Sequence, residues 1–520
     1  MKILKTFSFF FLAAKLLFPQ VLEAKPYLWT ANTMHSVKKN EKPGNSKNAE
    51  IWAAKGEYEP LQLVISAPSE DLTDIEVVVS NLEGPSGSID QLYIETYRIH
   101  YVDAENGSPT WRGPPNLPLG PGSYPDALIP LKPSGSPLAE LPKKNQSVKM
   151  GENQPYWIDI FIPKDTPAGK YKGVISVNSN QGTSEIDIDL TVWNFELPHR
   201  PSLRSMFGVW DNHKNSTEVM LKHRLMPFTL PKDKINHYDD KYGISTIGTG
   251  KWSGADSSNP HMKKPPSVEQ WSKVEKSFPE EFKGLLYNYT ADEIGSRNEL
   301  VDNLKKWGKN IHAGSSIKNL VTMVPNPDLF DDGSGQIAID TWVILPFQAQ
   351  DKTNKKNIEY VMAKGSEVWT YSALLQDNYS PKWMIDFPPI NYRIYAWINQ
   401  LFGYNGLLYW RVDMWSDDPW SSFGEKNHYP GDGMLIYPGD PVGIPGGVVP
   451  SLRLKQLRES VEDYEYIEIL KSMGEKDFAL EIVEILAKDW KKWSDDEELL
   501  MECRRLLGEK IHYLNTSTKK

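Results

Sequence analysis

The sequence predicts a multidomain β plus α/β chain, with an N-terminal β-sandwich, a distorted (β/α)8 barrel of the TIM type and a C-terminal helical segment. Two changes in the hydrophobic pattern along the 520 residues support this fold class. Strand-like runs separated by turns come first, strand-like and helix-like runs then alternate, and helical periodicity follows to the end. The predicted boundaries are 1–24 for a signal peptide, 25–198 for the sandwich, 199–450 for the barrel and 451–520 for helices packed on the barrel.

The first 24 residues have the pattern of a secretory signal peptide. Lys2 and Lys5 precede an apolar stretch, residues 7–14, and Ala24 supplies a small residue before the cleavage point. The stretch is interrupted by Lys15 and is shorter than the roughly 20 residues that a transmembrane helix needs. We therefore expect a soluble protein, secreted or periplasmic, with no integral membrane segment after cleavage.

The predicted sandwich region is rich in strand signals. Apolar and polar residues alternate there, or β-branched residues run together, and Gly, Pro and Asn separate the runs. Several short strands at this spacing favour a β-sandwich. Proline disfavours both helices and central strands, so Glu196–Leu203 is interpreted as a linker. The predicted strands are Leu61–Ala67, Asp74–Leu82, Tyr156–Pro163, Gly169–Ser179 and Ser184–Phe195.

Strands and helices alternate in the predicted barrel region. This alternation suits a (β/α)8 barrel, which takes about 250 residues, and an open doubly wound sheet is the alternative. Met226–Leu230 is a candidate seventh strand, and the polar stretch 231–279 shows no strand pattern. The clear strands are Arg204–Trp210, Gly284–Thr290, Asn319–Pro325, Asp340–Phe347, Glu367–Leu374 and Gly406–Val412, and the predicted helices are Arg297–Asn310, Asn354–Lys364 and Asn391–Phe402.

The C-terminal segment is predicted to be helical. Ser451 is a suitable N-cap for a helix over Ser451–Leu470, in which apolar residues recur at helical spacing. A second helix is predicted over Asp495–Ile511.

Composition narrows the classes of function. The net charge of −10 argues against nonspecific nucleic-acid binding. The 18 tryptophans suit sugar stacking, although most are expected in the core. The only cysteine, Cys503, excludes an intrachain disulfide. Metal-binding His or Cys clusters, a P-loop and a Gly-x-Ser-x-Gly elbow are all missing from the sequence, so no metal or other cofactor is expected.

Asp292 and Glu293 stand side by side where the apolar run Gly284–Thr290 ends. In a βα barrel this is the C-terminal face, where catalytic groups lie. The competing interpretation is that Asp292 caps the following loop and Glu293 pairs with a surface cation. The dipeptide alone is weak evidence, because it recurs at residues 496–497, where acids complement the dipole of a helix start. The preceding strand is what favours a catalytic pair.

Adjacent carboxylates suit one kind of glycoside hydrolysis better than another. Most glycosidases place two carboxylates across the sugar, about 5 Å or about 6.5–9.5 Å apart. Neighbouring residues fit substrate-assisted hydrolysis instead, in which one acid protonates the leaving oxygen and the other holds the 2-acetamido group of the substrate. Two like charges raise each other's pKa, which favours different protonation states for the two acids.

Other polar and aromatic residues fall at the same predicted face. Indoles there could form a sugar platform, and the Tyr371 hydroxyl could donate to an acetamido oxygen. For each, the competing interpretation is a packed barrel residue. The candidate substrate-binding residues are Asn288, Trp369, Tyr371, Trp410, Asp413 and Trp415.

Several stretches together resemble glycoside hydrolase family 123, whose catalytic region is also catalogued as domain of unknown function 4091. They are "GLLYWRVDMWSDDPW", "GDGMLIYPG", "PSLRLKQLRESVEDYEYIEIL", "GSEVWTYSALL" and "IDTWVILPF", with "AAKGEYEPLQLVISA" in the N-terminal region. The resemblance covers nearly the whole mature chain. It implies a retaining β-N-acetylgalactosaminidase with Glu293 as general acid/base and Asp292 polarising the acetamide through its N–H.

Two alternatives accompany this interpretation. One is a glycosidase for a different sugar, because residues 247–264 show no family pattern and precede the acid strand. The other is a non-catalytic carbohydrate-binding protein on the same fold. The expected partner is a glycan, nucleic acid is not expected, and no oligomeric state follows from the sequence.

Overall fold

The computed structural model describes residues 25–110, 116–135, 138–139, 147–211, 213–295, 297–374 and 377–517. The predicted signal peptide lies outside these residues. Within the described ranges, no helix has the length and apolar character needed to cross a membrane.

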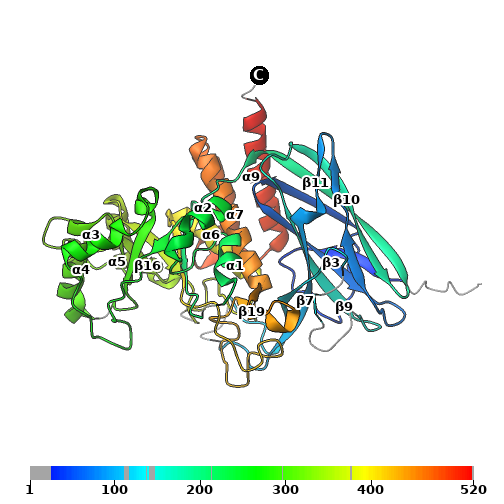
Figure 1. Ribbon diagram of the computed structural model, residues 1–520, viewed down its shortest axis with the longest axis horizontal. Helices are drawn as coiled ribbons and strands as arrows, with labels where there is room; N and C mark the ends of the chain where they lie inside the picture. Colours follow the sequence, from blue (N-terminus) through cyan, green and yellow to red (C-terminus); the bar gives the residue numbers. More distant parts are fainter. Residues whose placement is uncertain are drawn as a thin grey trace, which may run out of the picture.

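The N-terminal region forms two β-sheets packed face to face (Figure 1). Leu63 and Ile158 of one sheet share a hydrophobic cluster with Ile175 and Ile188 of the other, as expected for a sandwich. In the described residues, the first sheet has the order β1 (Tyr27–Ala31), β3 (Tyr58–Ser66), β9 (Asn153–Phe161), β7 (Ile94–Ala104), β8 (Gly122–Pro130). The second has the order β2 (Asn48–Lys55), β11 (Gly182–Glu196), β10 (Gly169–Ser179), β5 (Leu82–Gly84), β6 (Gly87–Ile89), and β4 (Glu76–Val79) also pairs with β10.

The barrel consists of parallel strands that almost close on themselves. In the described residues its seven strands have the order β12 (Arg204–Phe207), β18 (Gly406–Tyr409), β17 (Glu367–Tyr371), β16 (Thr341–Ile344), β15 (Lys318–Thr322), β14 (Leu286–Ala291), β13 (Ile247–Gly248). The candidate strand Met226–Leu230 is reduced to a parallel bridge between Pro227 and Phe207. The carbonyl of Phe228 also lies against Gly248, so this segment fills the gap between β12 and β13. The sheet is therefore a nearly closed, TIM-like barrel.

Helices surround the barrel sheet. The stretch 231–279, which shows no strand pattern in the sequence, contains α2, the two-residue strand β13 and α3. The predicted helices of this region are confirmed within a few residues as α4, α5 and α6. The bounds are α1 (Ser216–Lys222), α2 (Ile235–Tyr242), α3 (Val268–Lys276), α4 (Val301–Gly314), α5 (Lys352–Ala363) and α6 (Ile390–Phe402), and a short hairpin pairs β19 (Ile436–Pro438) with β20 (Val448–Pro450).

The C-terminal helices lie between the sandwich and the barrel (Figure 1). The hydroxyl of Ser451 caps α7 by accepting a hydrogen bond from the Leu454 N–H, as the sequence predicts. The segment consists of α7 (Leu452–Ser472), α8 (Lys476–Leu486), the strands β21 (Ala487–Asp489) and β22 (Lys492–Trp493), and α9 (Glu497–Ser517). Helix α7 is buried on all sides, because it packs on α6, α8 and α9 and also contacts β8.

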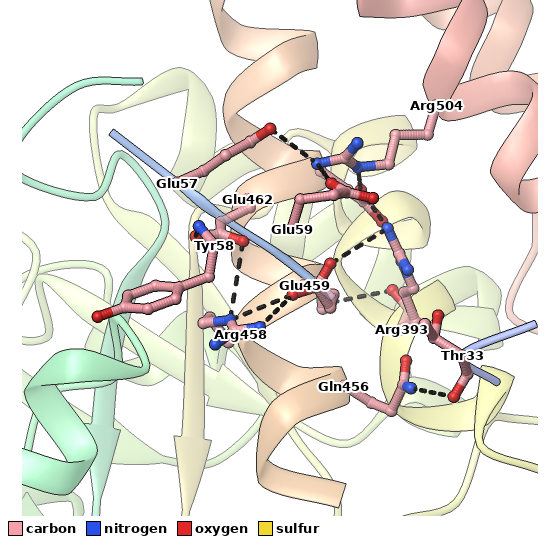
Figure 2. A network of polar contacts seen from close by, with 12 residues as sticks. Thr33, Glu57, Tyr58, Glu59, Arg393, Gln456, Arg458, Glu459, Glu462 and Arg504 are labelled. Atoms are coloured by element: carbon pink, nitrogen blue, oxygen red, sulfur yellow. Dashed lines mark hydrogen bonds and ion pairs between the residues drawn. The ribbon is translucent and has the colours of Figure 1, made fainter. Parts of the chain in front are cut away.

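The buried charges of α7 join the sandwich to the barrel (Figure 2). Lys455 and Arg458 both pair with Asp159 of β9, at 2.5 Å and 2.9 Å. Burial alone would raise the pKa of Asp159, but these two cations outweigh it and hold the pKa well below its usual range. On the same helix, Asp463 pairs with Arg393 of α6 and with Arg504 of α9. We call this set of contacts the α7 charge network.

Candidate active site

The acid pair lies at the carboxyl end of β14, and a β-bulge just before it sets its direction. Tyr289 pairs with Leu320 of β15, but Ala291 already pairs with Val321, so Thr290 is an extra residue. Tyr289 faces the barrel interior, whereas Ala291 belongs to the outer hydrophobic cluster. The bulge therefore breaks the strict alternation of a strand, and the next residue, Asp292, turns back towards the interior.

Backbone conformation then brings Glu293 to the same place. Side chains of consecutive strand residues normally point to opposite faces. Glu293 has φ +49°, in the left-handed region that non-glycine residues seldom adopt. Such a conformation costs about 1–3 kcal/mol and is typical of functional sites. The bulge and this turn explain how two adjacent acids can serve one pocket.

Asp292 is held by hydroxyl groups. The Tyr289 hydroxyl donates to Asp292 Oδ1 at 2.7 Å and lies 2.6 Å from Thr322 Oγ1 on β15. Burial raises the pKa of Asp292, the negative charge of Glu293 raises it further, and the hydroxyl hydrogen bonds oppose the shift. The backbone N–H of Asp292 is fixed by the carbonyl of Ala255, at 3.1 Å. This carboxylate is thus oriented without a counter-ion.

Glu293 is oriented from across the barrel. The hydroxyl of Tyr371, at the end of β17, donates to Glu293 Oε1 at 2.7 Å. Burial and the charge of Glu293 raise the pKa of Tyr371, which keeps its proton available for this bond. The sequence predicts that Tyr371 donates to a substrate oxygen; in this structure its proton is directed to the acid. Across the described ranges, no Lys or Arg forms a salt bridge with either Asp292 or Glu293.

Three predicted residues lie together at the end of β18. Trp410 is 36 % exposed. Asp413 is buried, and its Oδ2 accepts from the backbone N–H groups of Trp210 and Asp211, at 3.0 Å and 2.8 Å. Trp415 is half-buried and donates its indole N–H to the carbonyl of Ile436. Asp413 therefore braces the rim, while Trp410 offers an accessible indole.

Two predicted substrate-binding residues are fully buried and need correction. Asn288 lies on the outer face of β14, where its amide nitrogen donates to the Lys251 carbonyl and its Oδ1 accepts from Thr249 Oγ1. Trp369 packs on Tyr287 inside the barrel and donates to Glu367. In this structure neither side chain is accessible to a substrate, and Asn288 supports the acid strand.

Two further exposed tryptophans lie among the loops at the barrel mouth and were not predicted from the sequence. Trp252 is 37 % exposed and packs edge-on against Tyr289, with ring centroids 5.5 Å apart. Trp210 is 64 % exposed, yet its indole N–H is fixed by the Trp410 carbonyl at 2.7 Å. Trp210 is the last residue of the predicted strand Arg204–Trp210, so its position at a strand end was a usable signal. Trp252 lies in a stretch that shows no strand pattern, and nothing in the sequence singled it out.

A cluster of potential metal ligands lies beside the rim. Ligand atoms of Asp211, His213 and Asp413 all lie within 4.8 Å of one another. The guanidinium of Arg411 pairs with Asp211 and with Asp413, each at 2.9 Å. Because this cation already balances both carboxylates, the cluster needs no metal ion, and we assign none.

Comparison with protein families matches two parts of the chain. The model described as the catalytic domain of glycoside hydrolase 123 matches residues 230–470, which include the acid pair, Tyr371 and Trp410. The model described as the glycoside hydrolase 123 N-terminal domain matches residues 29–179. No curated protein matches the sequence.

A solved structure shares this architecture. A family 123 glycoside hydrolase from Clostridium perfringens, studied for glycolipid glycan hydrolysis, has a TM-score of 0.66 at 15 % identity, covering 95 % of this chain and 99 % of that chain. At this identity the similarity concerns the fold alone. A β-glucuronidase from Parabacteroides merdae has a TM-score of only 0.27 at 9 % identity, covering 79 % of this chain and 50 % of that chain, which is too little to support an argument.

Proposed function

Since this chain belongs to glycoside hydrolase family 123 and is a glycoside hydrolase, we propose that it is a retaining β-N-acetylgalactosaminidase. Its substrate would be a glycan with a terminal β-linked N-acetylhexosamine, and hydrolysis would use the 2-acetamido group of that sugar. We also propose that the protein is exported, in keeping with the leader pattern of residues 1–24.

In the proposed mechanism Glu293 gives its proton to the glycosidic oxygen as the bond to the anomeric carbon breaks. The acetamide carbonyl oxygen attacks the anomeric carbon from the opposite face, while Asp292 accepts the hydrogen bond of the acetamide N–H. Glu293, now ionised, then takes a proton from water, and this water opens the cyclic intermediate. Two inversions at one carbon give overall retention.

One observation carries the proposal: two adjacent carboxylates at the barrel mouth, one half-buried and one exposed, are each held by a different tyrosine. Tyr289 orients Asp292 and Tyr371 orients Glu293, at 2.7 Å in both cases. A phenol can donate to a carboxylate without neutralising its charge, so each acid remains free to exchange a proton or accept an N–H. A salt-bridged acid would be locked in its ionised form.

The experiment compares two chromogenic substrates, a β-N-acetylgalactosaminide and the matching β-galactoside. They differ only at the 2-position, where the proposed internal nucleophile lies. We expect turnover of the first alone. Equal turnover of both would exclude acetamide participation and would require a protein nucleophile.

A glycosidase for another hexosaminide is the second candidate, favoured by the wall beside the acid strand. Residues 249–255 run along β14, with the Ser253 N–H bonded to the Thr290 carbonyl at 3.1 Å. This segment carries Trp252, which is 37 % exposed and packs against Tyr289, the partner of Asp292. A panel of β-linked hexosaminides that differ at the 4-position would separate the two sugars. The highest kcat/KM identifies the preferred configuration.

A further inference from the structure

The sandwich reaches the loops at the mouth of the barrel through the hairpin of β7 and β8. The described residues of its connection are 105–110 and 116–121. At its base, the Asp103 N–H donates to the Ser421 carbonyl at 2.9 Å, and the Phe423 N–H donates to the Asp103 carbonyl at 3.1 Å. The hairpin therefore braces the loop that follows β18.

The same hairpin holds the segment between β17 and α6. Both carboxylate oxygens of the fully buried Asp386 accept from Ser108, one from its backbone N–H at 2.6 Å and one from its hydroxyl at 2.8 Å. The Leu119 N–H donates to the Asp386 carbonyl. Asn116 donates its amide hydrogens to the Ser380 carbonyl and to Asn391 Oδ1, at 2.9 Å and 2.8 Å.

These contacts matter because the segment lacks regular structure of its own. Residues 372–374 and 377–389 form neither helix nor strand. A connection of this length is usually functional, and its backbone polar groups need outside partners. The sandwich supplies several of those partners, so it defines the position of a segment that belongs to the barrel.

A short chain of contacts leads from the sandwich to the acid pair. Asn116 fixes Asn391 in the first turn of α6. On the same helix, the buried Tyr395 donates its hydroxyl to the backbone carbonyl of Tyr371 at 2.8 Å. The side chain of Tyr371 in turn donates to Glu293. Three hydrogen bonds and one turn of α6 make up this chain, and its middle residues, Asn391, Tyr395 and Tyr371, are buried.

We propose that the β7–β8 hairpin is a positioning element of the active site, which acts through Asn116, α6 and Tyr371 on Glu293. This inference rests on the proposed function, because Tyr371 acts here as the hydrogen-bond donor to Glu293, the proposed general acid. The sandwich would thus contribute to turnover and not only to stability.

The test is a double-mutant cycle between Asn116→Ala and Tyr371→Phe, with kcat and KM measured on the chromogenic β-N-acetylgalactosaminide. Alone, Asn116→Ala should lower kcat about tenfold, because small displacements of a catalytic group are costly, and should leave KM within about twofold. Tyr371→Phe removes a donor that favours the ionised carboxylate, so the alkaline limb of the pH–rate profile should move to higher pH. Asn116→Ala should move this limb in the same direction. In the Tyr371→Phe background, Asn116→Ala should cost little more.

Two matched variants separate positioning from stability. The isosteric Asn116→Asp keeps the volume but lacks the donors, and should reproduce the loss in kcat. Asn32→Ala removes another sandwich asparagine, which donates to Glu498 of α9, and should leave kcat and the pH profile unchanged. Additive effects of Asn116→Ala and Tyr371→Phe on kcat, or a lower Tm with normal kcat in Asn116→Ala, would overturn the positioning role and leave the proposed function standing. Wild-type turnover by Glu293→Gln would overturn the proposed function, and the positioning role with it.

Discussion

The α7 charge network buries its carboxylates among cations, whereas the acid pair lies at the barrel mouth, where Asp292 is half-buried, Glu293 is exposed and the partners are hydroxyl groups. In the network, Asp159 lies between Lys455 and Arg458, and Asp463 lies between Arg393 and Arg504. At the mouth, the described side chains that bond to Asp292 and Glu293 do so through hydroxyl groups, namely those of Tyr289, Thr322 and Tyr371. The first arrangement fixes charge, whereas the second leaves protonation free to change.

The comparison shows that burial alone does not identify a functional acid. Glu462 lies beside Arg458 of the network, at 3.9 Å, yet burial together with the charge of Glu459 raises its pKa well above the usual range. A raised pKa therefore occurs in both regions. What sets the mouth apart is position at the strand ends, the strained Glu293 backbone and the phenol donors.

The largest expected effect is on turnover, from Glu293→Gln. The amide has no acidic proton to give, so kcat on a substrate with a poor leaving group should fall about 10²–10⁴-fold. The variant should keep its sugar affinity and its Tm, because no cation is left unpaired. Turnover and thermal unfolding are measured on the same preparation. Retained turnover would show that the acid is elsewhere.

The largest expected effect on stability comes from Arg458→Met in the α7 charge network. Removing one partner of a buried ion pair leaves Asp159 without part of its compensation, which costs about 3–5 kcal/mol. Denaturant unfolding should show this loss, while kcat per folded molecule stays unchanged.

Arg505→Met on the outer face of α9 is the matched control. Arg505 also pairs with two acids, Glu502 and Glu509, but these side chains are 32–49 % exposed. Exposed pairs contribute at most about 1 kcal/mol, so this variant should unfold nearly as the wild type does. Equal losses in the two variants would contradict the contrast between buried and exposed pairs.

The smallest expected effect is a gain in stability from Asp292→Asn, accompanied by loss of turnover. Burial and Glu293 raise the pKa of Asp292 in the folded state, so folding disfavours its ionised form. This cost is absent below the ordinary aspartate pKa and fully present above the raised one. The Tm difference between variant and wild type should therefore be near zero in acid and become positive as the pH rises. A thermal scan across pH measures it, and a Tm loss at neutral pH would mean that Asp292 is a structural acid.

Local patterns made much of the fold predictable. Strands such as β10 and helices such as α6 show their hydrophobic periodicity within a short stretch of sequence. The barrel was predicted from the alternation of such strands and helices along the chain. β13 was not visible because two residues carry no period. Strands β7 and β8 were missed as well: the Pro-Asp step weakens the strand signal of β8, whereas the apolar–polar alternation of β7 was a usable signal.

The candidate site was predictable only in part. Asp292 and Glu293 drew attention because they are adjacent and follow an apolar strand. Their partners depend on contacts that a sequence does not display, since 78 residues separate Tyr371 from Glu293. The bulge at Thr290 also has no sequence signature here. Asn288 and Trp369 were overestimated because polar and aromatic side chains on a barrel strand can equally face the packed interior or the helices.

The placement of α7 also has a consequence for how the molecule is made. A ribosome completes Asp159 of the sandwich 296 residues before Lys455, its partner on α7. At about 5–20 residues per second, this interval lasts roughly 15–60 s. Throughout it Asp159 has neither of the two cations that it pairs with in the folded protein. The ion pairs that join the sandwich to α7 can therefore form only after most of the chain has been made.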